Sequence, residues 1–173
     1  MTTLGTGCLL FPSLAIAAPS DGDTLQVAVV ALNRGMAHVK ALLKLPGVTI
    51  KYLAEVDETR LAAGLKAVAD VQKAPCKGVA DFRTFLDDKE LDAVFIATPN
   101  FWHTPAALLC MAAGKHVYVE KPGSQNPREA EMIVESARKH GRLCQMGNQR
   151  RSWPGIIEGI AKLQEGSIGK VHH

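Results

Sequence analysis

The chain has 173 residues, 47% of them hydrophobic, and a formal net charge of +3. A chain of this length supports one ordinary domain that can bury roughly two-thirds of its unfolded surface. The charge is small and scattered, which argues against nucleic acid as a partner, and no apolar run is long enough to span a bilayer. The four cysteines show neither metal-ligand nor Cys-x-x-Cys spacing, so we expect no metal site and no redox pair.

Residues 1–20 differ in composition from the rest of the chain. An apolar run over residues 9–18 leads into the small residues around Ala17, which is typical of a secretory cleavage site. The basic residues that open a signal peptide are absent. Two interpretations stay open. The segment is the back part of an export signal, which places the natural protein in the periplasm or outside the cell, or it is a disordered extension of a cytoplasmic protein.

From residue 21 onward, apolar strand patterns alternate with helical ones. We expect strands at residues 25–31 and 48–56 and at most a short strand within 72–80. A helix from about Gly35 should bury Met36, Val39, Leu42 and Leu43, and Pro46-Gly47 should end it. A second helix is expected at residues 58–70, followed by a short helix at 82–86.

The second half continues the alternation. Residues 92–98 and 116–119 read as buried strands, joined by a helix that Thr104 caps, with Pro105 as its first residue. A last strand at 142–146 precedes a helix at 155–165. This alternation predicts an α/β fold with a doubly wound parallel sheet.

The helix between the last two of these strands has the clearest local signals. Asn126 is the expected cap, Pro127 the first residue, and Glu129 completes a capping box. Gly141 should end the helix. Its expected buried stripe consists of Ala130, Ile133, Val134 and Ala137.

The first strand-to-helix turn is where a dinucleotide pyrophosphate would lie. Such a turn usually carries Gly-x-Gly-x-x-Gly, but here Ala31, Asn33 and Met36 replace the three glycines. Gly35 is out of register, Arg34 precedes it, and the turn is one residue short. Asn33 tolerates a positive φ better than most residues, which compensates in part.

Two carboxylates end the second predicted strand. Glu55 and Asp57 lie near the position whose carboxylate binds the adenosine ribose, and a negative charge there favours NAD over NADP. Asp57 is equally suited to cap the following helix. We therefore prefer Glu55 as the ribose ligand.

Polar clusters follow the next two strands, and they carry a family resemblance. Ala97-Thr98-Pro99-Asn100, then His103, then Glu120-Lys121-Pro122 resemble, in order and spacing, the first domain of the glucose–fructose oxidoreductase / inositol dehydrogenase / rhizopine catabolism (Gfo/Idh/MocA) family. The resemblance covers about residues 25–173 and implies an NAD(P)-binding Rossmann domain at 21–150. Residues 151–173 would then begin the connection to a second α/β domain that this chain lacks, as a fragment or a gene remnant.

The resemblance also implies roles for individual residues. Thr98, Pro99 and Asn100 would lie along the cofactor, Glu120 would face the nicotinamide ribose, and Asn148 and Gln149 would lie toward the nicotinamide. Lys121 would be catalytic, bridging cofactor and substrate. His103 would lie near the cofactor or be a plain helix-start residue. Arg150 and Arg151 would meet the substrate or form a solvated turn.

The implied function is oxidation or reduction of a sugar, cyclitol or related polyol with NAD(H). Some members of the family use bound NAD to hydrolyse glycosides instead, so that chemistry is an alternative. A non-catalytic nucleotide-binding or interaction module is another, because the glycine turn is degenerate. The sequence predicts no membrane or nucleic-acid partner and leaves homo-oligomerisation open.

Overall fold

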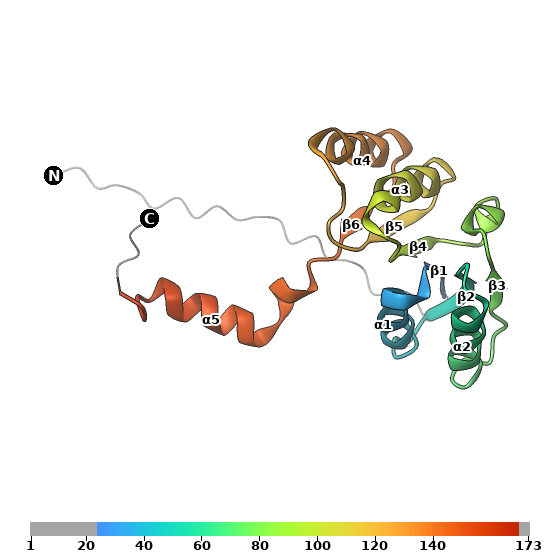
Figure 1. Cartoon of the computed structure of the whole chain (residues 1–173), viewed down its shortest axis with the longest axis horizontal. Helices are drawn as coiled ribbons and strands as arrows, with labels where there is room; N and C mark the ends of the chain where they lie inside the picture. Colours follow the sequence, from blue (N-terminus) through green and yellow to red (C-terminus); the bar gives the residue numbers. More distant parts are fainter. Residues whose placement is uncertain (1–23, 170–173) are drawn as a thin grey trace.

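The computed structural model describes residues 24–169 (Figure 1). The N-terminal segment interpreted as an export signal or an extension therefore lies outside the described residues, as does Cys8. The fold begins at β1, where Val27, Ala28, Val29 and Val30 are at most 5% exposed. Such burial on both faces is what a continuous run of apolar residues produces in a central parallel strand.

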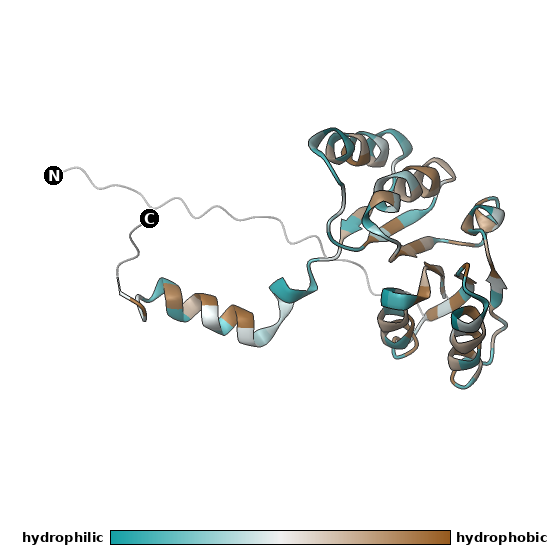
Figure 2. Cartoon of the chain, in the orientation of Figure 1, coloured by the Kyte–Doolittle hydropathy of each residue, from teal (hydrophilic) through white to brown (hydrophobic). Residues whose placement is uncertain are grey.

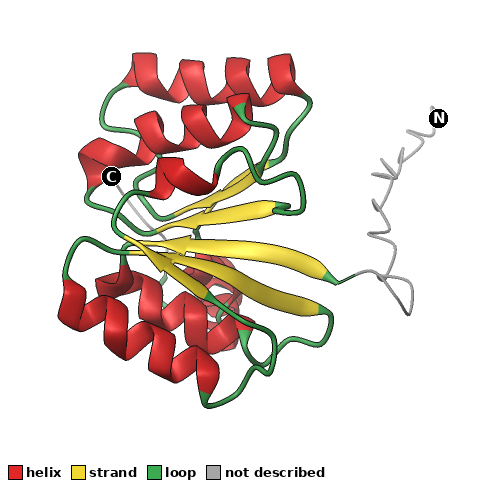
Figure 3. Ribbon diagram, turned by 90° about the vertical axis from the view of Figure 1, so that its right-hand side faces the viewer, coloured by secondary structure: helices red, strands yellow, loops and turns green. Residues whose placement is uncertain are grey.

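Six parallel strands form one sheet between two layers of helices, as Figure 3 shows. The spatial order is β3-β2-β1-β4-β5-β6. All five strand pairs are parallel, as the doubly wound prediction requires. The strands are β1 Leu25–Val30, β2 Val48–Ala54, β3 Lys77–Val79, β4 Ala93–Ile96, β5 His116–Val119 and β6 Cys144–Met146.

Five α-helices and three short 3-10 helices connect the strands or follow them within the described residues. The α-helices are α1 Leu32–Leu42, α2 Glu58–Ala69, α3 His103–Ala112, α4 Pro127–His140 and α5 Pro154–Gln164. The 3-10 helices are η1 Phe82–Phe85, η2 Asn100–Trp102 and η3 Gln149–Ser152.

Each face of the sheet has its own core. On one face, Val39 of α1 and Val68 of α2 are fully buried with Val27 and Leu53 of the sheet. On the other face, Met111 of α3 belongs to a separate cluster that includes Ala28 of β1 and Val94 of β4. The strand order reverses between β1 and β4, and in sheets of this kind ligands bind in the crevice at the carboxyl ends of the strands at such a point.

Two local predictions about helix starts are wrong. Helix α1 begins at Leu32, three residues before the expected Gly35, so Ala31 alone separates it from β1. Thr104 does not cap α3. The helix begins at His103, and the Thr104 hydroxyl instead donates to the carbonyl oxygen of Gly123 at 3.3 Å. In both cases a hydrogen bond joins the helix start to a distant segment of the chain, from the Leu32 amide to Glu55 in α1 and from Thr104 to Gly123 in α3.

The cap of α4 is confirmed, but its predicted stripe is only half correct. The Asn126 side chain accepts from the Glu129 amide at 2.9 Å, and Gly141 ends the helix in the left-handed conformation. Ile133 and Ala137 pack against the core. Ala130 and Val134, predicted to be buried, are exposed, so α4 meets the core through only part of the predicted stripe.

Helix α5 stands apart from the sheet (Figure 1). Figure 2 shows the hydrophobic residues along it, and Ile156, Ile160 and Leu163, which we expected on one side, are 42–49% exposed. Among residues 24–169, no helix is both long enough and apolar enough to cross a membrane.

Candidate functional site

Two cavities lie at the carboxyl edge of the sheet, where the strand order reverses. One has a volume of about 760 Å³ and is lined by residues that follow β4, β5 and β6. The other, of about 770 Å³, lies beside the carboxyl ends of β1, β2 and β3. Arg34, Ala97 and Thr98 line both cavities, so the two are neighbouring parts of one trough.

The first turn differs from a glycine-rich turn in a specific way. Ala31 is the only residue between β1 and α1, and its φ of 67° is in the region that favours glycine. A methyl group therefore stands where dinucleotide-binding turns have a glycine. Gly35 is buried, and a side chain there would meet Val29 at 3.0 Å, so it serves close packing of α1 on the sheet.

Glu55 holds this turn in place. Its Oε2 accepts a hydrogen bond from the Leu32 amide at 2.6 Å, and its Oε1 accepts from the amides of Val56 at 2.9 Å and Asp57 at 3.2 Å. The residue is only 7% exposed. The carboxylate that we expected to be available for the ribose is thus engaged by three backbone amides.

Asp57 acts as the helix cap that its position suggested. It is the N-cap of α2, and its Oδ1 accepts from the Arg60 amide at 3.0 Å. The Arg60 guanidinium lies 4.0 Å from the other carboxylate oxygen. Asp57 lines neither cavity.

Glu120 is the most heavily bonded side chain of the site. Its Oε1 accepts from Arg34 Nε at 3.1 Å and from Gln149 Nε2 at 3.3 Å, and His38 Nε2 lies 2.9 Å away. These partners come from α1 and from η3. They bring the end of β5 together with the first turn and the segment after β6.

The pKa values of Glu120 and His38 both lie below their usual values, for different reasons. Burial acts to raise the pKa of the Glu120 carboxyl, but the hydrogen bond and the charge of Arg34 outweigh it, so the pKa lies below the usual value. Burial also lowers the pKa of His38, against the opposing attraction of Glu120. At neutral pH the carboxylate is therefore charged and the imidazole is neutral, so the His38 N–H donates to Glu120.

His103 connects the two polar turns that the sequence singled out. Its Nδ1 lies 2.5 Å from the carbonyl oxygen of Pro122, and its Nε2 lies 2.9 Å from that of Thr98. The ring is 1% exposed. It is therefore more than a helix-start residue, because it joins the segment after β4 to the segment after β5.

Lys121 differs from Glu120 beside it, because its side chain has no hydrogen-bond or ion-pair partner in the described part of the chain. It is exposed at the rim of the first cavity, and its ammonium group makes no hydrogen bond or ion pair within residues 24–169. The peptide bond that follows it, to Pro122, is cis. The ammonium group is thus available to a ligand in that cavity.

The first cavity and the first turn differ in the hydrogen-bonding groups that they leave unused among the described residues. The hydroxyl oxygen of Thr98, at the junction of the two cavities, is buried and has no hydrogen-bond partner in the described part of the chain. Gly147 also lines the first cavity, and a Cβ there would lie 2.5 Å from the Tyr118 hydroxyl. At the first turn, by contrast, Glu55 already occupies an amide.

The structure brings most of the predicted site residues to this edge. The first cavity is lined by Arg34, Thr98, Asn100, His103, Glu120, Lys121, Asn148 and Gln149, and also by Arg150 and Arg151. The second cavity is lined by Ala31, Asn33, Arg34, Glu55, Thr98 and Pro99. Gly35, like Asp57, lines neither. Within residues 24–169, no group of three metal-ligating side chains lies together.

Sequence reasoning missed the aromatic side of the second cavity. Phe101 and Trp102 line it while remaining 56% and 41% exposed, and Phe82 lies beside Trp102, with 6.5 Å between the ring centroids. Exposed aromatic surface of this kind suits a flat ring system such as a purine. Two consecutive large aromatic residues in a turn after a strand end were the available signal. His38 was missed as well, because nothing in the local pattern places it against Glu120.

A family model described as GFO_IDH_MocA, oxidoreductase family, NAD-binding Rossmann fold, matches residues 23–148. These residues include β1 to β6 and every predicted cofactor-binding residue except Gln149. The match agrees with the strand order and with the position of both cavities.

Three individual proteins illustrate the similarity. A glycosyl hydrolase family 109 protein of Saccharopolyspora erythraea is 34% identical over 127 residues, which are 70% of this chain and 28% of that protein. Myo-inositol 2-dehydrogenase of Lactobacillus plantarum superposes with a TM-score of 0.74 at 24% identity, covering 86% of this chain and 43% of that one. Scyllo-inositol dehydrogenase of Lactobacillus casei, solved with NAD(H) and scyllo-inositol, gives 0.72 at 24% identity over the same shares. The two structures support the fold alone, and the chain spans less than half the length of each of the three.

Proposed function

Because the chain belongs to the Gfo/Idh/MocA family of oxidoreductases and contains its NAD-binding Rossmann domain, we propose that it holds NAD along the two cavities as the cofactor part of an enzyme acting on a sugar, cyclitol or related polyol. The observation that carries this proposal is the meeting of Thr98, Glu120 and Lys121 in one cavity at the point where the strand order reverses. Separate segments of the chain, after β4 and after β5, supply these residues.

Each end of the dinucleotide has suitable partners. The aromatic pair Phe101 and Trp102 suits the adenine, and the first cavity suits the nicotinamide and its ribose. Bound NAD would supply a hydride acceptor. In that cavity the Lys121 ammonium can donate to a ribose hydroxyl and to a substrate hydroxyl, while Glu120, fixed by Arg34 and His38, can accept from a ribose hydroxyl.

We favour NAD over NADP on electrostatic grounds. Glu55 lines the second cavity and Asp57 follows it closely in the chain, so negative charge near the adenosine end would repel a 2′-phosphate. Arg60 lines the same cavity and could favour the phosphate, but it pairs with Asp57. Arg83 also lines the second cavity and pairs with Asp81 at 2.6 Å.

The substrate class rests on the relatives. One related structure contains scyllo-inositol with NAD(H), which supports a cyclitol or sugar. The similarity to a glycosyl hydrolase family 109 protein supports a second candidate, glycoside cleavage with NAD retained in the site. In a longer protein that contains this domain, accumulation of NADH with a polyol would favour the first candidate, and release of a sugar from a glycoside without NADH would favour the second.

A thermal-shift comparison of NAD and NADP tests the cofactor proposal on the chain itself. A ligand that binds only the native state must raise its melting temperature. We expect a rise with NAD and a smaller one with NADP at equal concentration. A larger rise with NADP would contradict the choice of cofactor. No rise with either would support a non-catalytic module that has lost nucleotide binding.

A further inference from the structure

We propose that His38 is a positioning residue of the cofactor site, which fixes Glu120 so that the protein holds one carboxylate oxygen and leaves the other for a ribose hydroxyl. The inference rests on the proposed function, because it concerns how Glu120 meets NAD. His38 lies on α1, one turn after Arg34, and lines neither cavity. It can therefore affect a ligand there only through another side chain.

The contacts of Glu120 are divided unequally between its two oxygens. Oε1 accepts from Arg34 and from Gln149, and His38 Nε2 lies 2.9 Å from it. Among the described residues, Oε2 accepts only from the backbone amide of Lys121, at 3.3 Å. Each carboxylate oxygen has two lone pairs, so Oε1 has no acceptor capacity left while Oε2 has some.

Aromatic neighbours hold the His38 ring in place. Its centroid lies 5.9 Å from that of Phe95 on β4 and 5.1 Å from that of Tyr118 on β5. The His38 side chain is 13% exposed. A ring packed against two others has few alternative orientations, so its Nε2 stays within hydrogen-bond distance of Glu120.

His38 is a firmer partner of Glu120 than Arg34 is. The Arg34 side chain is 52% exposed, and an exposed ion pair is weak because solvent screens it and the long side chain loses rotamer freedom. A hydrogen bond from a largely buried N–H to a carboxylate is stronger. Burial lowers the pKa of His38, so at neutral pH the ring is uncharged and supplies one N–H donor.

The tautomer of His38 tests the inference without any ligand or variant. A neutral imidazole that donates to Glu120 must carry its proton on Nε2, the nitrogen beside Oε1. Long-range proton–nitrogen NMR of the labelled 1–173 chain at neutral pH distinguishes the two tautomers. We expect His38 to be protonated at Nε2, and protonation at Nδ1 alone would overturn the inference.

Two variants separate positioning from packing. His38→Gln keeps an N–H donor near the place of Nε2 but loses the ring, whereas His38→Phe keeps the ring and loses the donor. By calorimetric titration we expect His38→Phe to bind NAD about tenfold more weakly, as for one lost hydrogen bond to a charged group, and His38→Gln to stay within about threefold of the unmodified chain. His140→Phe is the matched control. It makes the same change on α4, which lines neither cavity, and should alter NAD affinity less than about twofold.

The ionisation of Glu120 gives a readout that a packing role would not move. A hydrogen bond to the charged form lowers the pKa of a carboxyl, and His38 contributes to the lowered pKa of Glu120. In carboxyl-carbon NMR without NAD, the pKa of Glu120 should be higher in His38→Phe than in the unmodified chain, and His38→Gln should restore most of the difference. An unchanged pKa in a folded His38→Phe, or equal losses of NAD affinity in the two variants, would overturn the inference. If His38→Phe does not fold, the tautomer of His38 decides.

The outcomes also separate this inference from the proposed function. If the unmodified chain binds NAD and folded His38→Phe binds it equally well, only the inference fails. If the unmodified chain does not bind NAD, the proposed function fails, and the His38 tautomer and the pKa of Glu120 still decide whether His38 positions that carboxylate.

Discussion

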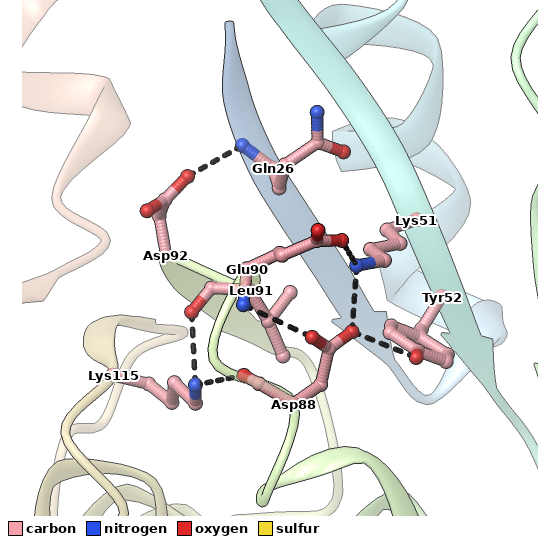
Figure 4. A network of polar contacts seen from close by, with 8 residues as sticks. All are labelled: Gln26, Lys51, Tyr52, Asp88, Glu90, Leu91, Asp92 and Lys115. Atoms are coloured by element: carbon pink, nitrogen blue, oxygen red, sulfur yellow. Dashed lines mark hydrogen bonds and ion pairs between the residues drawn. The ribbon is translucent and has the colours of Figure 1, made fainter.

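Lys115 and Lys121 stand at opposite edges of the same sheet, one directly before β5 and the other just after it. Lys115 is 3% exposed, and its ammonium group donates to the carbonyl oxygens of Asp88 and Leu91, the latter at 3.0 Å (Figure 4). Lys121 is exposed, and its ammonium group makes no hydrogen bond or ion pair within residues 24–169. The same side chain is thus used for structure at one edge and left available at the other.

The surroundings of Lys115 extend this pattern. Figure 4 shows the Asp88 carboxylate between Tyr52, whose hydroxyl donates to it at 2.8 Å, and Lys51, whose ammonium lies 2.8 Å away. Asp92 accepts from the Gln26 amide at 2.7 Å and joins β1 to the start of β4. The charged groups of this network are each engaged by another part of the domain.

The difference indicates where stability and function lie. At the amino edge the polar groups of this network are satisfied and fix the loops before the strands, although the buried Nε of Arg142, just before β6, has no hydrogen-bond partner in the described part of the chain. At the carboxyl edge, Lys121 and the Thr98 hydroxyl have unused hydrogen-bonding capacity beside two cavities within the described residues. Changes at the amino edge should therefore lower stability, and changes at the carboxyl edge should lower affinity.

The largest expected effect is on stability, from Lys115→Met. Methionine retains the apolar stem but leaves two carbonyl oxygens without their donor, so we expect a loss of about 2–4 kcal/mol of unfolding free energy. Burial lowers the pKa of Lys115, which means that keeping the buried ammonium charged costs free energy. Removing the charge recovers that cost and offsets part of the expected loss of stability. Urea denaturation measures the effect. A loss of unfolding free energy below about 1 kcal/mol, or any change in NAD affinity, would contradict the claim that the amino edge serves stability alone.

The next largest effect is on affinity, from Lys121→Met. A hydrogen bond from a charged donor contributes about 1.5–3 kcal/mol, so NAD binding should weaken roughly 10–100-fold. The urea midpoint should stay the same, because the Lys121 ammonium has no partner in the described part of the chain. Calorimetry and denaturation on one preparation check both statements. A loss of stability with unchanged affinity would make Lys121 a structural residue.

A smaller effect concerns acid stability at the amino edge. The hydrogen bond from Lys51 lowers the pKa of Asp88 to about 2. Because the folded-state pKa lies below the unfolded value, this stabilisation is complete above about pH 4 and is lost as the pH falls toward 2. Asp88→Asn should remove about 1–2 kcal/mol at neutral pH. The variant and the unmodified chain should converge in stability near pH 2, and a constant difference down to that pH would contradict the assignment.

The smallest effect concerns the first turn, through Ala31→Gly. Glycine relieves the positive φ but gains freedom in the unfolded chain, so the net stabilisation should be about 0.5–1 kcal/mol. NAD affinity should rise slightly, because the backbone can approach the pyrophosphate more closely. Thermal denaturation with and without NAD measures both. Destabilisation by glycine would show that the methyl group of Ala31 has a packing role.

The fold was predictable because its signals are local. The strand at His116–Val119 and the cap at Asn126 were expected where they occur, since apolar runs and capping residues act within a few positions. The start of α1 was not predictable, because Glu55 fixes it from 23 residues away. Thr104 does not cap α3 for a similar reason, because its hydroxyl donates to the carbonyl oxygen of Gly123, which is distant in the chain.

The site was predictable to a similar extent. The rule that ligands bind at the carboxyl ends of parallel strands placed Thr98, Glu120 and Lys121 together, and the structure does so. No such rule shows which side chains already form hydrogen bonds with other groups of the protein. The contact of His38 with Glu120 and the occupation of the Leu32 amide by Glu55 depend on tertiary geometry.

Titration of the isotopically labelled chain with NAD, followed by amide NMR, tests the division between the two edges most directly. If the carboxyl edge binds the cofactor, NAD should shift the amide signals there progressively as its concentration is raised. The signals to follow are those of Asn33, Thr98, Lys121 and Asn148. The signals of Gln26, Lys51 and Asp92, at the amino edge, should stay in place. Shifts concentrated at the amino edge, or no shift at either edge at millimolar NAD, would contradict the account.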